Sequence, residues 1–138
     1  MRKRNSTLEF ASERSECLLK NFRESISRQS VISRRRALRE AVEAPAPRFW
    51  VTEARATRII AMLLKGEDVT GGMFPEKRRM YMEILRRVRE EKERHPEMPL
   101  GDIVFGVVNS EAPSSYLSEW SAYKILVTRK KFPKNSAV

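Results

Sequence analysis

The sequence predicts an all-α protein built from two tandem three-helix repeats. When residues 13–65 are shifted by 66 positions, they align without a gap on residues 79–131, and 11 of the 53 aligned pairs are identical. Most of the other aligned pairs that agree share an apolar, aromatic, hydroxyl or cationic character. Apolar residues recur at helical spacing in both copies, and no stretch sustains the alternation of a β-strand. The pattern therefore indicates an internal duplication of a small helical unit.

The first repeat is expected over residues 10–66, after a basic flexible arm at residues 1–9. Its first helix is predicted over about residues 8–28, and its second over about 31–43. Ser30 is expected to cap the second helix, because a serine hydroxyl accepts hydrogen bonds from the free amides of a helix start. The inward stripes of the two helices are Phe10, Leu18, Leu19, Phe22 and Ile26, followed by Ile32, Leu38 and Val42.

A proline-rich corner separates the second helix from the third. The helix is expected to stop at residues 44–47, APAP, because residues before proline avoid helical backbone. An apolar turn, residues 49–51, leads to Thr52, which is expected to cap the third helix, with Glu53 in its first turn. Gly66 is expected to end this helix. Its inward face consists of Ala56, Ile59, Ile60 and Leu63.

The second repeat is expected over residues 75–132, after a linker at residues 67–74. Pro75 is placed to open its first helix. Residues 103–108, IVFGVV, resemble a strand in isolation, but their alignment with residues 37–42 favours a helix. The three helices are predicted over about 75–94, 99–109 and 118–131, with Ser118 as the last cap, Phe132-Pro133 as the stop and residues 133–138 as a tail.

The composition favours an acidic partner. The 28 lysines and arginines exceed the 18 acids, which gives a net charge of +10. Nucleic acid is the usual partner of such a chain, because each cation placed on a phosphate releases a counterion. A solvated basic surface that keeps a small protein soluble is the alternative. Cys17 is the only cysteine, which excludes an intramolecular disulfide and suits a cytoplasmic location.

The sequence lacks the patterns of an enzyme, a secreted protein or a membrane protein. His95 is the only histidine, and neither metal-ligand spacing nor a glycine-rich phosphate loop occurs. No apolar segment follows the basic N-terminus as in a signal peptide. The longest apolar run, Ile59–Leu64, is too short to span a bilayer. We therefore expect a non-enzymatic protein without cofactor or metal, located in the cytoplasm or on the nucleoid.

Three helices with a corner before the third resemble the trihelical helix-turn-helix class, which includes Myb-like and homeodomain-like domains. The resemblance covers about residues 10–65 and 76–131. The corner at about residues 44–51 is longer than the turn of three or four residues typical of the class. The resemblance implies a third helix in the major groove of DNA, with the other helices on the backbone.

Candidate contacts to nucleic acid fall on the third helices and on two basic clusters. Arg58 and Lys124 occupy aligned positions and rank first, because either residue type can bind guanine or phosphate. The third helix of the first repeat adds Arg55 and Lys65, and that of the second adds Ser121 and Thr128. The clusters are Arg34, Arg35, Arg36 and Arg48 in the first repeat, and Arg129, Lys130 and Lys131 near the C-terminus.

Three functions remain open at this point. The first is binding of duplex DNA through both third helices, as a small transcriptional regulator or architectural protein. The second is a structural adaptor that binds another protein through an exposed aromatic patch made by Phe49, Trp50, Tyr116 and Trp120. The third is binding of structured RNA, including ribosomal RNA, through the same basic surface.

Overall fold

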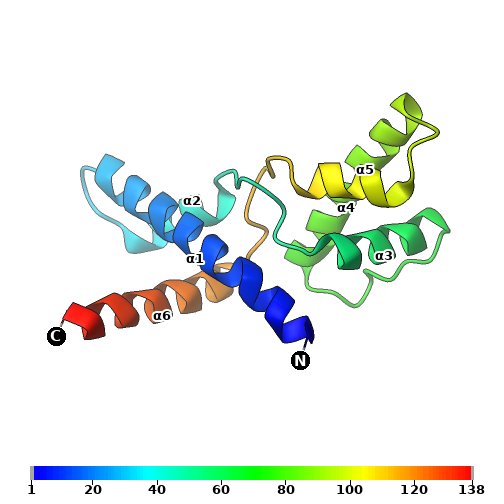
Figure 1. Ribbon diagram of the computed structural model, residues 1–138. Coiled ribbons are helices and arrows are strands. Elements are labelled where there is room, and N and C mark those ends of the chain that lie inside the picture. Colours follow the sequence, from blue (N-terminus) through cyan, green and yellow to red (C-terminus); the bar gives the residue numbers. More distant parts are fainter. Residues whose placement is uncertain (1, 138) are drawn as a thin grey trace. The chain divides into compact units, whose positions relative to one another are not determined.

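The computed structural model is all-helical, which confirms the all-α part of the predicted fold class. It describes residues 2–137, and it describes side chains for residues 10–128. The backbone forms α1 (Arg2–Arg28), α2 (Arg34–Glu43), α3 (Glu53–Leu64), α4 (Pro75–Arg94), α5 (Leu100–Val108) and α6 (Glu119–Ala137) (Figure 1). Within this described part of the chain, extended pairing is limited to one isolated antiparallel bridge between Ala46 and Ala112.

Helix boundaries differ from the sequence-based expectations at three places. α1 begins at Arg2, within the expected flexible arm, and α6 continues to Ala137, beyond the expected stop at Phe132. α2 is capped by Ser33 and not by Ser30, because the Ser33 hydroxyl accepts from the Arg36 amide at 3.2 Å. Ile32 therefore precedes α2 and is 62% exposed, although an inward position was expected.

The signals at the other helix ends act as predicted. The Thr52 hydroxyl accepts from the Arg55 amide at 3.2 Å, and the aligned Ser118 hydroxyl accepts from the Ser121 amide at 3.0 Å. Gly66, with φ +94°, follows α3 in the left-handed conformation. Residues 103–108 lie in α5, as expected, and Ile103, Val104, Val107 and Val108 are buried.

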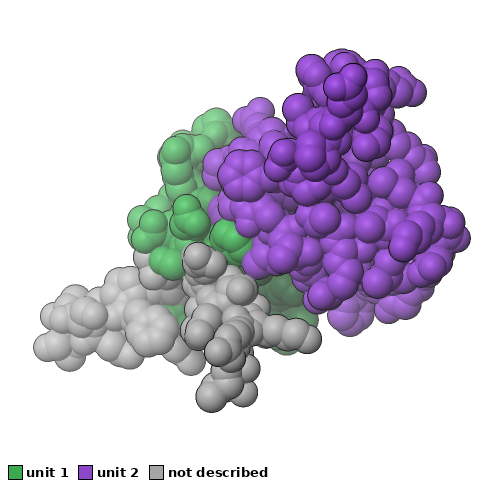
Figure 2. Space-filling view, turned by 45° about the vertical axis from the view of Figure 1, so that its right-hand side comes forward, with its two compact units in different colours: residues 1–45, 113–138 green, residues 46–112 purple. Residues whose placement is uncertain are grey.

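The six helices form two compact units, and neither unit is a contiguous repeat. Unit 1 comprises residues 1–45 and 113–138 and contains α1, α2 and α6; unit 2 comprises residues 46–112 and contains α3, α4 and α5 (Figure 2). This division differs from the expected ranges of 10–66 and 75–132. Each unit combines the first two helices of one half of the chain with the third helix of the other half.

Backbone hydrogen bonds fix the proline-rich corners within the units. In unit 2 the Phe49 amide donates to the Val108 carbonyl at 2.9 Å, and in unit 1 the Ser115 amide donates to the Val42 carbonyl at 3.0 Å. Phe49 aligns with Ser115, and Val42 aligns with Val108, under the 66-residue shift. Each corner is thus bonded to a helix of the opposite half. Because residues before proline favour extended backbone, the chain stays non-helical between the second and third helices of each half.

The two units bury aligned side chains in their cores. The α6 residues Ala122 and Leu126 pack into the core of unit 1, and the aligned α3 residues Ala56 and Ile60 are buried in unit 2. Other aligned pairs that are buried in both units include Leu18 with Ile84, Phe22 with Val88, Ala37 with Ile103 and Ala41 with Val107.

Candidate nucleic-acid interface

Unit 1 carries almost all of the net positive charge of the protein. It contains 16 lysines and arginines against seven aspartates and glutamates, whereas unit 2 contains 12 against 11. The net charges are therefore +9 and +1. Electrostatic attraction for a polyanion falls mainly on unit 1, because the charges of unit 2 nearly cancel.

In unit 2 many arginines are already paired with acids. Arg86 lies 2.7 Å from both Glu83 and Glu90, and Arg87 lies 2.8 Å from Glu83. Hydrogen bonding from Arg86 is the main reason that the pKa of Glu83 lies below its usual value. The α4 face is consequently a network of ion pairs, which leaves less charge for phosphate.

The first turn of α2 presents two unpaired arginines in unit 1. Arg34 and Arg35 are exposed, and neither has an ion-pair or hydrogen-bond partner among the described side chains. The third member of the expected cluster, Arg36, instead pairs with Glu40 at 2.9 Å. Hydrogen bonds from Ser25 and then from Arg36 hold the pKa of Glu40 below its usual range, so Glu40 stays ionised and keeps Arg36 engaged.

The outward face of α6 carries an aromatic pair beside a cation. Trp120 is 64% exposed and Tyr123 is 52% exposed, and their rings stack with centroids 5.8 Å apart. The ammonium group of Lys124 lies 5.6 Å from the Trp120 ring. Thr128 is exposed as well, whereas Ser121 is half-buried beside the Ser118 cap. The side chains of Arg129, Lys130 and Lys131 lie outside the described residues.

The remaining candidates lie in unit 2, on or near α3. Arg55, Arg58 and Lys65 are exposed. The structure thus places Arg58 and its aligned counterpart Lys124 in different units. Both point to solvent, as the helical stripe predicted.

Arg48 is bonded within unit 2, so its donors are largely occupied. It donates to the carbonyls of Phe49 at 2.9 Å and Val51 at 2.7 Å, and to the Asn109 side chain at 3.0 Å. Asn109 in turn donates to Glu53 at 3.0 Å. Sequence reasoning missed Asn109, which aligns with Glu43 and carries no local signal for this contact. Arg48 therefore stabilises the corner through its hydrogen bonds to Phe49, Val51 and Asn109.

The four aromatic residues expected at the corners differ in exposure. Phe49 is fully buried, and the guanidinium group of Arg87 lies 5.1 Å from its ring. Trp50 and Tyr116 are half-buried, and Trp120 is exposed. Phe49 is thus a core residue of unit 2 and is not available for a protein partner.

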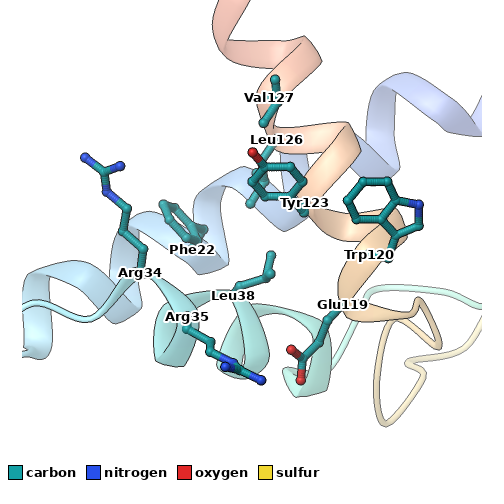
Figure 3. A pocket seen from close by; sticks show the side chains of 9 residues that line it. All are labelled: Phe22, Arg34, Arg35, Leu38, Glu119, Trp120, Tyr123, Leu126 and Val127. Carbon is teal, nitrogen blue, oxygen red and sulfur yellow. The ribbon is translucent and has the colours of Figure 1, made fainter.

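A groove opens in unit 1 between α2 and α6, with Phe22 of α1 at its floor (Figure 3). Its volume is about 690 Å³, and it is open to solvent. Leu38, Leu126 and Val127 line it with apolar surface, and Arg34, Arg35, Glu119, Trp120 and Tyr123 complete the lining. Glu119 lies 3.6 Å from Arg39, so its charge is partly offset.

The described residues hold no metal cluster and no membrane-spanning helix. Among the described residues, no group of three or more histidine, cysteine or acidic side chains is arranged to hold a metal. None of the helices in this part of the chain has both the length and the apolar character to cross a membrane. The chain matches no protein-family model, and comparisons with curated proteins and with solved structures give no match.

Proposed function

We propose that the protein is a non-enzymatic nucleic-acid-binding protein that binds duplex DNA chiefly through unit 1. The concentration of net charge in unit 1, +9 against +1, is the observation that carries this proposal. Duplex DNA presents a dense array of phosphates, and each cation placed on it contributes affinity by counterion release. Lys124 and Thr128 on the outer face of α6 suit a helix that lies in a groove, and Arg34 and Arg35 suit the flanking backbone.

We further propose that the two halves are copies of one three-helix unit that exchange their third helices. The aligned buried positions and the matching corner hydrogen bonds support this origin. Divergence of the copies then concentrated cations in unit 1 and left unit 2 as a structural support. Accordingly, unit 1 would bind DNA and unit 2 would stabilise the structure, so the two units would not bind DNA equally.

Fluorescence anisotropy with labelled duplex DNA across a salt series tests the binding face. The matched variants are Lys124→Glu and Arg58→Glu, which alter aligned, exposed positions by the same charge. We expect Lys124→Glu to weaken binding by roughly tenfold and to lower the salt slope by about one, because one phosphate contact is lost. Arg58→Glu should stay within about twofold of the wild type, since its unit has little net charge to attract phosphate.

Two double variants distinguish the effect of local contacts on DNA affinity from the effect of total charge. Arg34→Glu with Arg35→Glu removes the unpaired cations of α2, and Arg79→Glu with Arg89→Glu makes the same charge change on exposed residues of α4. Acids in the first turn of a helix favour its dipole, so the α2 variant should stay folded. Equal losses in both variants would show that net charge alone attracts DNA, and would contradict a binding face on unit 1.

The choice of nucleic acid is tested in the same assay. Duplex RNA of matching sequence and each single strand are titrated beside the DNA duplex. Tighter binding of duplex RNA at every salt concentration would replace the DNA proposal with the structured-RNA alternative. Loss of binding to all of them by about 0.15 M salt would mean that the charge is a general surface property, and would contradict a nucleic-acid function.

A further inference from the structure

The α2–α6 groove of unit 1 combines an apolar floor, an aromatic wall and a cationic edge. Its floor is apolar, with Phe22, Leu38 and Leu126 packed on the core. One wall is the stacked pair Trp120 and Tyr123, which extends from α6 (Figure 3). Exposed aromatic rings in contact with water are costly, so a flat ligand that covers them would gain binding energy.

The opposite edge of the groove supplies positive charge. Arg34 and Arg35 project from the first turn of α2, Arg34 on the side of Phe22 and Arg35 on the side of Glu119 (Figure 3), and neither forms an ion pair with a described side chain. The one acid that lines the groove, Glu119, lies near Arg39. An occupant must therefore join a planar apolar part to an anionic part, and the two parts must be close enough to meet opposite walls.

We propose that this groove binds one unpaired nucleotide, with its base against Trp120 and Tyr123 and its phosphate beside Arg34 and Arg35. The proposal rests on the proposed nucleic-acid function and names the form of nucleic acid that unit 1 prefers: a duplex with an unpaired base. Every base has a flat face that stacks on aromatic side chains, so the groove selects for an unstacked base and not for a sequence. Lys124, beside the Trp120 ring, adds a cation next to the stacking surface.

Three labelled duplexes test this proposal against the purified protein. One is fully paired, one carries a single unpaired nucleotide, and one carries an abasic residue at the same place. We expect the duplex with the unpaired base to bind roughly tenfold more tightly than the abasic duplex, since stacking on an aromatic side chain contributes this much. The abasic and fully paired duplexes should bind alike.

Variants assign the preference to the groove. Trp120→Ala with Tyr123→Ala should abolish the difference in affinity between the duplex with the unpaired base and the abasic duplex. The matched control is Phe74→Ala with Phe105→Ala, which removes two exposed aromatic rings from unit 2 and should keep the preference. Circular dichroism checks that both variants remain helical.

Tryptophan emission gives a readout that does not depend on the alanine variants. Trp50→Phe leaves Trp120 as the only tryptophan, and a base stacked on Trp120 should quench its emission. The abasic duplex should leave the emission unchanged at saturation. Equal quenching by both duplexes, or equal affinity for all three, would overturn the groove proposal while the nucleic-acid function stands. Failure of every duplex to bind would overturn the proposed function itself.

Discussion

Ala46 and Ala112 donate backbone hydrogen bonds to each other, with N–O distances of 2.9 and 2.8 Å. The two residues are also each other's counterparts under the 66-residue shift. This contact supports the proposed exchange of third helices between two copies of one unit. The contact lies at the start of both proline-rich corners, where the chain passes from one unit into the other.

The first prediction concerns the space around these two alanines. Their side chains are 1% and 0% exposed, so Ala46→Leu or Ala112→Leu should force the corner apart. We expect each variant to lower the free energy of unfolding by about 1–3 kcal/mol, as overpacking does. Urea denaturation measures it, with Ala54→Leu on the exposed side of α3 as the control. A loss no larger than that of the control would contradict tight packing at the corner.

The second prediction separates Arg48 from the DNA-binding candidates. Arg48 donates to two carbonyls of its own corner and to Asn109. Arg48→Ala should therefore lower the free energy of unfolding by about 1.5–3 kcal/mol, the range for hydrogen bonds that involve a charged group. DNA affinity of the folded fraction should stay within about twofold. Arg48→Lys should restore little, because lysine lacks the planar fork that reaches several acceptors.

If Arg48→Ala leaves the free energy of unfolding unchanged and lowers DNA affinity, Arg48 contacts DNA and the prediction is wrong. The measurement therefore needs both readouts on the same preparation. Thermal unfolding gives the first, and anisotropy below the unfolding temperature gives the second. Asn109→Ala is the matched variant, because it removes one acceptor of Arg48 without changing the charge.

The helices of this protein were predictable because their signals are local. Thr52, Ser118 and Gly66 act on neighbouring backbone groups, and the apolar stripes follow helical spacing. The choice of packing partner was not predictable, because both halves present aligned apolar faces, such as Leu18 and Ile84. The face of Ala56 and Ile60 fits the helices of either half equally well by pattern, so only the path of the corners decides which helices it contacts.

The same distinction applies to the candidate site. Arg36 has Glu40 one helical turn away, whereas Arg34 and Arg35 have Leu38 and Arg39 at that spacing, so the sequence already separates paired from unpaired cations. The bonds of Arg48 to Asn109 join residues far apart in the chain and leave no local signal. The groove beside Trp120 was not predictable for a similar reason, since its walls come from α2 and α6, which are far apart in the sequence.

The third prediction concerns the end of α3. The Gly66 amide donates to the Leu63 carbonyl at 3.0 Å, and the Glu67 amide donates to the Met62 carbonyl at 3.0 Å, which is the Schellman pattern. A Cβ at position 66 would meet no atom within 4 Å. Gly66→Ala should therefore cost about 1 kcal/mol through the positive φ alone. Gly72→Ala, also in open space, is the control for thermal denaturation, and equal stability of both variants would contradict the prediction.

The last prediction concerns acid sensitivity at the start of α3. The pKa of Glu53 lies below its usual value, mainly because the Asn109 side chain donates to its carboxylate; the charge of Arg48 acts in the same direction, and partial burial opposes both. A folded-state pKa below the unfolded one means that ionised Glu53 stabilises the fold above the unfolded pKa of about 4.3. This contribution is lost as the pH falls through the folded-state pKa.

Glu53→Gln removes this titration and leaves the size of the side chain nearly unchanged. The wild type should be more stable than the variant near neutral pH, and the difference should shrink as the pH falls from about 5 to about 3. Urea denaturation at a series of pH values measures the difference directly. Asn109→Ala should reduce the pH dependence in the same way, because it removes the main donor to the carboxylate. Parallel stability curves for wild type and Glu53→Gln across this range would contradict a folded-state pKa of Glu53 below its unfolded value.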